Sequence, residues 1–485
     1  MNAELDELRR RLALPVPHPD GATRADWAEQ VLQWSLQHFS TLPEQTIGAA
    51  LDRPELDRLL AEPPPLEGMP FPQALDEFTS KVMPNAFRTM HPRFLAFVPG
   101  APSFPSILGD WLCAAANFFA GVWIEASAPA EVELVVLDWF KEWLGYPNAA
   151  RGILTSGGSE ANLTALVVAR QGVPFADRQR LVLYLSEQRH RSIDRAAMVM
   201  GLHPNQLHAV PQDSEYRLSA KALAAAIDSD RRRGFLPWAV AANAGATNTG
   251  TVDQLNEIAD VCTANRLWFH VDAAYGGPAV LIPEGKQKLS GIERADSITF
   301  DPHKWFGQTF EAGGLLVRNG KRLAETFALR PDYMQDVEPT QEQVNFCDHG
   351  IALTRRFRAL KIWLSVKVLG VAWFRHLVQH CCDLAEFAER LVTQTQGFVI
   401  SCRRQLSIIC FRYEPPGWSD VERIDELNLS ILEDLRQSGV AFLSSTRLHG
   451  RVVIRMCFVN WRTTSGDVEQ IVNLLKQFAD QRSLA

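Results

Sequence analysis

The spacing of apolar and polar residues divides the chain into three regions. In residues 1–90, apolar side chains recur at helical spacing, as in ADWAEQVLQWSLQHF. The proline-rich stretch AEPPPLEGMPFP interrupts that pattern, because consecutive prolines cannot continue a helix. These features predict a helical N-terminal arm that packs on the rest of the molecule or on a second subunit.

Between residues 91 and 370, short apolar runs alternate with helical stretches. The runs GILT, LVLYLS, WAVAANAG, LWFHVDAAY and SITFDPHKW are typical of buried strands. The alternation predicts an α/β domain with a mainly parallel central sheet and helices on both faces. The stretch ALTRRFRALKIWLSVKVLG predicts a long helix that closes this domain. Residues 371–485 predict a smaller α+β C-terminal domain.

Polar clusters follow several of the predicted strands, in TSGGSEANL, HVDAAYGG and DPHKWF. In an open parallel sheet, ligands bind at the carboxyl ends of the strands. Because each cluster falls just after its strand, we expect the three clusters to converge on one site.

The turn from Ser156 to Ser159 has the features of an anion site. Glycines let a ligand approach the backbone, and the free N–H groups and dipole at the start of the next helix favour negative charge. An ordinary strand–helix turn with a serine cap is the alternative. The turn lacks the lysine of a P-loop and the glycine spacing of a dinucleotide-binding loop.

Asp272 and Lys304 add two further groups at strand ends. A carboxylate after a fully apolar strand needs a cation or a donor, because desolvating it alone is costly. An enclosed lysine can form a Schiff base with a carbonyl. A structural salt bridge and a lysine extended along the sheet edge are the alternatives. Together with the anion turn, these residues match the phosphate, pyridinium nitrogen and aldehyde of pyridoxal 5'-phosphate (PLP).

Composition narrows the classes of protein. The net charge of -7 argues against nucleic acid as a partner. No apolar run is long enough to span a membrane, and the N-terminus is too charged for a signal peptide. The eight cysteines form no C-x-x-C pair. We therefore expect reduced thiols in a cytoplasmic protein, without a metal site.

The pair HVDAAYGG and DPHKW resembles the group II PLP-dependent decarboxylases, which include aromatic L-amino acid, histidine, tyrosine and glutamate decarboxylases. The blocks HPRFLAFVPGAPSFPSILGDWL, SGGSEANLTALVVAR, SEQRHRSIDRAA, NAGATNTGTVD and LTRRFRALKIW also resemble family blocks, in the family's order. The resemblance implies the PLP-dependent transferase fold (aspartate aminotransferase-like, fold type I). It also implies a homodimer with the active site at the interface and the arm wrapped over the partner.

The resemblance also implies roles for individual residues. Lys304 resembles the lysine of the internal aldimine, Asp272 the aspartate on the ring nitrogen, His190 the histidine stacked on the ring, and Tyr333 the acid on a mobile loop. The implied cofactor-binding residues are Gly158, Ser159, His190, Thr247, Asp272, Ala274, His303 and Lys304. The implied substrate-binding residues are Phe97, Gly100 and Thr354.

The expected activity is decarboxylation of an aromatic or heteroaromatic L-amino acid to the amine and CO2. The alternatives are an acidic or other non-aromatic substrate, and decarboxylation coupled to oxidative deamination, which gives an aldehyde. The presence of His190 and Tyr333 favours the amine. Two residues depart from the family pattern: Asp301 stands where some relatives have asparagine, and Glu125 at the pocket mouth either favours a basic or hydroxylated substrate or makes a structural salt bridge.

Overall fold

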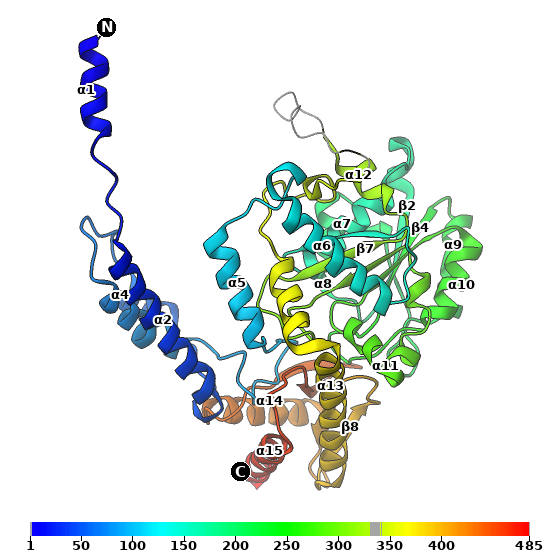
Figure 1. The fold of residues 1–485 in the computed structure, drawn as a ribbon. Coiled ribbons are helices and arrows are strands. Elements are labelled where there is room, and N and C mark those ends of the chain that lie inside the picture. Colours follow the sequence, from blue (N-terminus) through cyan, green and yellow to red (C-terminus); the bar gives the residue numbers. More distant parts are fainter. Residues whose placement is uncertain (1, 330–339, 341, 485) are drawn as a thin grey trace. The chain divides into compact units, whose positions relative to one another are not determined.

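The computed structural model describes residues 2–329, 340 and 342–484. The chain divides into two compact units, Met1–Arg88 and Thr89–Ala485. The α-helices of the first unit are α1 (Asn2–Leu12), α2 (Gly21–Thr41), α3 (Arg53–Leu60) and α4 (Phe71–Glu77) (Figure 1). Asp20 caps α2 by accepting a hydrogen bond from the backbone N–H of Thr23. Trp27 stacks on Phe71 at 5.1 Å and joins α2 to α4.

In the described part of the second unit, the central sheet has seven strands in the order β1-β7-β6-β5-β4-β2-β3 (Figure 1). The strands are β1 (Arg151–Thr155), β2 (Leu181–Ser186), β3 (Leu207–Val210), β4 (Leu236–Asn243), β5 (Trp268–Asp272), β6 (Ser297–Phe300) and β7 (Gly313–Val317). Strands β3, β2, β4, β5 and β6 are parallel, and β7 lies antiparallel between β6 and β1. The predicted mainly parallel sheet is confirmed.

Helices cover both faces of this sheet, as the side chains of β2 show. Leu181, Leu183 and Leu185 pack with α7 (Gly158–Arg170) and α8 (Arg191–Val199). Val182 and Tyr184 point to the other face and join the core that contains α9 (Ala220–Arg232) and α10 (Leu255–Asn265). Because both faces of the sheet are buried at β2, its sequence is a nearly continuous apolar run rather than an alternation of apolar and polar residues. The other helices around the sheet are α5 (Phe104–Ala116), α6 (Trp123–Trp143), α11 (Pro283–Lys288) and α12 (Lys321–Phe327).

The long helix predicted for residues 352–370 begins later and runs further, as α13 (Ala359–Gln394). Its start is displaced because the carbonyl of Arg355 accepts a hydrogen bond from Ala120 N–H, outside any helix. The Arg355 guanidinium is fully buried against Glu133, at 2.7 Å. Gly370, with φ 73° and ψ 156°, kinks α13 one residue before the predicted C-terminal domain, 371–485.

Beyond α13, a four-stranded antiparallel sheet in the order β10-β11-β9-β8 forms within the described residues. Its strands are β8 (Phe398–Cys402), β9 (Ile408–Tyr413), β10 (Ser444–Leu448) and β11 (Arg451–Cys457), and its helices are α14 (Val421–Gln437) and α15 (Ser465–Leu484). This arrangement confirms the small α+β fold predicted for the C-terminal region. All eight cysteines of the chain are buried, with free thiols.

Candidate active site

A cavity of about 420 Å³ opens at the carboxyl edge of the central sheet. Strands β2, β4, β5 and β6 run in parallel and end there, and β1 runs the same way because β1 and β6 are both antiparallel to β7. All the predicted cofactor-binding residues line this cavity: Gly158, Ser159, His190, Thr247, Asp272, Ala274, His303 and Lys304. The convergence predicted from the strand ends is what the structure shows.

The turn after β1 forms one wall of the cavity. Ser156 donates hydrogen bonds from its N–H and its hydroxyl to Glu160, at 2.8 and 2.7 Å, and these bonds hold the turn in shape. Helix α7 starts at Gly158, so its N-terminal end faces the cavity. A Cβ atom on Gly158 would lie 3.0 Å from Asp301 Oδ2. The lack of a side chain therefore keeps this helix end open to an anion.

Asp272 is the last residue of β5 and is 8% exposed. Its Oδ2 accepts a hydrogen bond from Asn162 Nδ2 at 2.9 Å, and its Oδ1 accepts one from the backbone N–H of Ala274 at 3.1 Å. These two bonds hold the Asp272 carboxylate in place at the cavity.

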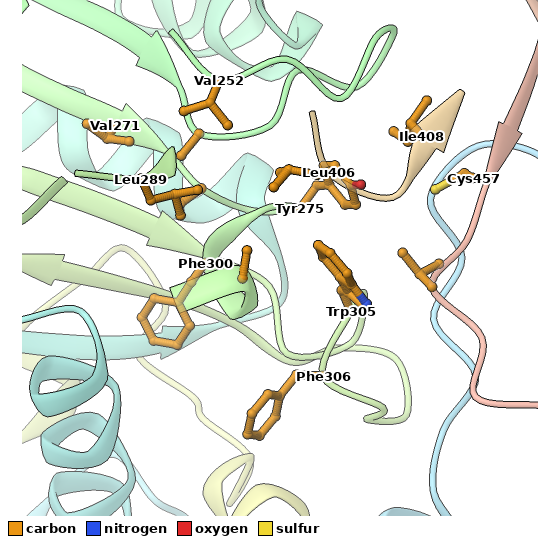
Figure 2. Close-up of a cluster of buried hydrophobic side chains, with 14 of the residues drawn as sticks. Val252, Val271, Tyr275, Leu289, Phe300, Trp305, Phe306, Leu406, Ile408 and Cys457 are labelled. Carbon is orange, nitrogen blue, oxygen red and sulfur yellow. The ribbon is translucent and has the colours of Figure 1, made fainter. Parts of the chain in front are cut away.

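Lys304 lies in the turn that follows β6, with its Nζ 3.0 Å from Asp301 Oδ2. Burial lowers the pKa of Lys304, but the charges of Asp301 and Asp272 outweigh burial and leave that pKa above its ordinary value. The next two residues anchor the turn in the core (Figure 2). Trp305 stacks on Tyr275 at 5.4 Å, and Phe306 stacks on Phe374 at 4.1 Å.

The structure gives Asp301 a partner that the sequence did not indicate. The partner of Asp301 is Lys304, with His303 Nε2 further away at 3.8 Å. Asp301 is 2% exposed, and within the described chain its Oδ1 has no hydrogen-bond partner. A buried carboxylate oxygen of this kind needs a donor to complete its hydrogen bonding.

Two histidines also line the cavity. His303 Nδ1 lies 2.8 Å from the carbonyl oxygen of Ala312, and burial lowers the pKa of His303. His190 caps α8: its Nδ1 accepts a hydrogen bond from the N–H of Ser192 at 3.2 Å and lies 2.8 Å from the hydroxyl of Ser192. Burial also lowers the pKa of His190, against the opposing charge of Asp272.

The predicted substrate-binding residues do not line this cavity. Phe97 is 58% exposed with φ 55°, and Thr354 is exposed. Gly100 packs on the backbone, where an added Cβ would lie 2.2 Å from the carbonyl oxygens of His303 and Lys304. Tyr333 lies outside the described residues. Glu125 is exposed in the first turn of α6.

Sequence reasoning missed several residues that line the cavity: Asn162, Ser192, Asn243, Gly245, Tyr275 and Glu311. For Asn162 a signal exists in the sequence. It falls in line with Leu166 and Ala169 on the buried stripe of α7, where a polar residue is unusual. Asn162 therefore could have been identified as a group that needs a polar partner under the site.

An anion turn, a fixed carboxylate and a lysine around one cavity fit the three handles of PLP. The fold and the site together define a PLP-dependent enzyme of fold type I. Residues 55–414 match the family described as the pyridoxal-dependent decarboxylase conserved domain, and the chain belongs to that family. It is a PLP-dependent amino-acid decarboxylase.

Individual relatives resemble the chain along most of its length. It is 39% identical to the aromatic-L-amino-acid decarboxylase of Bacillus atrophaeus, with 94% of this chain and 95% of that protein covered. Identity to the phenylacetaldehyde synthase of Arabidopsis thaliana is 29%, with coverage of 90% and 91%. The crystal structure of Oryza sativa TDC with PLP and tryptamine superimposes with a TM-score of 0.92 at 27% identity, and covers 96% of this chain and 100% of that one.

None of the helices among the described residues is both long and apolar enough to cross a membrane. No group of three or more histidine, cysteine, aspartate or glutamate residues among them is arranged to hold a metal ion.

Proposed function

We propose that the enzyme converts an aromatic or heteroaromatic L-amino acid to the corresponding amine and CO2. The observation that carries this proposal is Phe310, which does not itself line the cavity but whose ring is 60% exposed and lies 5.5 Å from that of His303, which does. An exposed aromatic ring beside the reacting groups offers an apolar face to a flat side chain. The similarity to the aromatic-L-amino-acid decarboxylase of Bacillus atrophaeus supports the same substrate class.

The chemistry follows from how the residues are placed around the cofactor. When bound, PLP supplies an electron sink for the negative charge that remains at Cα after CO2 leaves. The turn from Ser156 to Ser159 would hold the phosphate, and Asp272 would hold a proton on the ring nitrogen. His190 would cover one face of the ring. Charged and dipolar groups fixed in advance are the usual large term in such catalysis.

Lys304 must release a proton before its nitrogen can bond to a carbonyl carbon. Asp301 Oδ2, at 3.0 Å, is placed to accept that proton. The same contact holds the charged form of Lys304, as the raised pKa of Lys304 indicates. On the geometry of this contact, and against the raised pKa of Lys304, we assign Asp301 the role of the proton acceptor for Lys304 during cofactor attachment.

The resemblance to the decarboxylase family assigns the final protonation of Cα to Tyr333. The Tyr333→Phe substitution removes this acid, so we expect the product to shift from amine toward aldehyde, with consumption of O2 and release of ammonia and peroxide. The similarity to phenylacetaldehyde synthase makes the aldehyde the relevant alternative product. Equal amine yields from the parent enzyme and the Tyr333→Phe variant would exclude this role for Tyr333.

A homodimer is the second part of the proposal, with the active site at the interface. Exposed apolar side chains in α5, in the loop that follows it, at the start of α6 and in the segment before α13 support it: Trp111, Leu112, Phe118, Ile124, Ile351 and Leu353. The last two regions lie together, because Cys347 N–H donates to the carbonyl of Gly121 at 2.9 Å. We expect twice the chain mass by sedimentation. Ile124→Asp should lower that mass, whereas the exposed Val399→Asp on β8 should not.

We also propose that the protein acts in the cytoplasm on a small-molecule amino acid. Eight buried free thiols are consistent with a reducing compartment.

A panel of L-amino acids tests the substrate assignment when CO2, amine, aldehyde and peroxide are measured separately. We expect the highest kcat/KM for tryptophan, tyrosine, phenylalanine or histidine. Phe310→Ala should raise KM for these substrates, because it removes the apolar face. A higher kcat/KM for glutamate or another non-aromatic amino acid would refute the aromatic assignment.

A further inference from the structure

A continuous chain of hydrogen bonds lies beneath the cavity and connects β5 and β6 to both sides of the active site. Its interior members are the buried residues Ser297, His270, Thr299, Asn162 and Ser192. It starts at Trp268 on β5 and ends at Asp272 and His190. These interior members take no direct part in the proposed chemistry.

Trp268 sets the direction of the first bonds. An indole N–H can only donate, and it donates to Ser297 Oγ at 2.8 Å. The hydroxyl hydrogen of Ser297 is then available to His270 Nδ1, also at 2.8 Å. Burial lowers the pKa of His270 to about 4, so the ring is neutral near pH 7. We assign its proton to Nε2, because that nitrogen faces Asn162 Oδ1, which can only accept. His270 Nε2 therefore donates to Asn162 Oδ1 at 2.9 Å.

The orientation of the Asn162 amide is set by Asp272, whose carboxylate only accepts, so that the atom facing it is Nδ2. Its Oδ1 accepts from His270 and also from the Thr299 hydroxyl at 2.8 Å. Its Nδ2 group must then supply the two remaining bonds, one to Asp272 Oδ2 at 2.9 Å and one to Ser192 Oγ at 2.8 Å. One amide thus serves both the carboxylate and the serine.

The last step fixes the proton on His190. Because Ser192 Oγ accepts from Asn162, its own hydrogen points to His190 Nδ1 at 2.8 Å. The backbone N–H of Ser192 donates to the same nitrogen at 3.2 Å. With two donors aimed at it, Nδ1 carries no proton, and the neutral ring bears its proton on Nε2.

We propose that Ser192 is a positioning residue that keeps His190 neutral, with its proton on Nε2, and that Asn162 ties this state to the carboxylate of Asp272. Protonation of Nδ1 would set its hydrogen against the Ser192 N–H and would leave the serine hydroxyl without an acceptor. The neutral state of His190 matters for the proposed function, on which this inference rests. A charged imidazolium over the cofactor ring would oppose the proton that Asp272 would hold on the nitrogen of that ring.

The charged groups that face His190 have opposing effects on its pKa. Asp272 and Asp301 favour a charged ring, whereas Lys304 and Arg195, the latter on α8 itself, disfavour it. The net effect is that the pKa of His190 lies below its ordinary value, and burial is the largest cause. Loss of the Ser192 hydroxyl removes a bond made to the neutral ring alone, so it should raise the pKa of His190.

The test compares holoenzymes that carry Ser192→Ala, Ser192→Thr or the control Ser365→Ala. Ser365 is also a buried hydroxyl, in α13, and its loss should affect stability without changing the protonation of His190. In Ser192→Ala we expect the acid limb of the kcat/KM profile to move up by about 0.5–1 pH unit. Ser192→Thr retains the hydroxyl and should keep the native limb.

A spectroscopic measurement separates this inference from the proposed function. In 15N spectra of histidine-labelled native enzyme, with the His190 signals identified by their loss in His190→Gln, we expect a protonated Nε2 and an unprotonated Nδ1. A proton on Nδ1 would overturn the inference, whatever the substrate is. A native acid limb in Ser192→Ala, or equal shifts in the alanine and threonine variants, would also overturn it.

Discussion

The substitution Gly100→Ala tests how backbone contacts position Lys304. The sequence associates this glycine with the substrate pocket, but the structure places it against the turn that carries Lys304. A Cβ atom at this position would lie 2.2 Å from the carbonyl oxygens of His303 and Lys304. Nearby, Ser103 N–H donates to the carbonyl of Gly307 at 2.7 Å, so the segment around Gly100 contacts both ends of the turn.

The expected magnitude follows from that distance. Ordinary van der Waals contacts of a Cβ atom lie at 3.4–4 Å, so in Gly100→Ala the turn would have to withdraw by about 1 Å. Both neighbouring atoms belong to the backbone, which cannot rotate away as a side chain can. A displacement of about 1 Å at a reacting group costs about 100-fold in rate. We therefore expect Gly100→Ala to lose about 100-fold in kcat and to bind PLP more weakly.

The assay measures kcat, the PLP dissociation constant and thermal unfolding of the same preparation. Gly466→Ala, at the start of α15, is a matched control, because there an added Cβ meets its nearest neighbour at an ordinary 3.7 Å. The control should retain native kcat and PLP affinity. A folded Gly100→Ala enzyme with native kcat and native PLP affinity would refute the reasoning from close approach.

Three further predictions concern covalent attachment, a buried ion pair and acid stability. Lys304→Ala should lose the visible absorbance of the lysine-bound cofactor, and borohydride should no longer fix PLP to the chain by mass spectrometry. Arg355→Met leaves the fully buried Glu133 without its cation, so urea unfolding should show a loss of about 3–5 kcal/mol, and adding Glu133→Gln should restore part of it. Burial lowers the pKa of His349 to about 4, so the stability from its neutral ring is complete above pH 6.5 and falls as the pH drops toward 4, by about 3 kcal/mol. His349→Asn should flatten that part of the curve, and an unchanged slope would contradict the prediction.

The sequence predicts best those residues whose place is determined by a strand end. Asp272 and Lys304 follow strands that alternate with helices, and the edge at which parallel strands end is common to all of them. Their meeting in one cavity therefore follows from the order of elements alone. The same holds for Gly158, which opens the helix after β1.

The sequence does not predict the positions of residues that act through contacts between distant segments. The requirement for glycine at position 100 comes from backbone atoms about two hundred residues further along the chain. Asn162 and Ser192 lie on different helices, and their bond depends on how each helix is rotated against the sheet. The position of Asp301 could be predicted from sequence, but its pairing with Lys304 depends on the shape of the turn between them.

The burial of the thiols has a practical consequence for studying the enzyme. The thiolate is the form of cysteine that reacts, and burial raises the pKa of Cys402 and Cys410 to about 12 and that of Cys457 to about 11. Alkylating reagents should therefore leave the native cysteines intact in the folded protein. A single cysteine introduced on the exposed surface becomes the reactive one, so a fluorophore or spin label can be attached at a chosen site without replacing any native thiol.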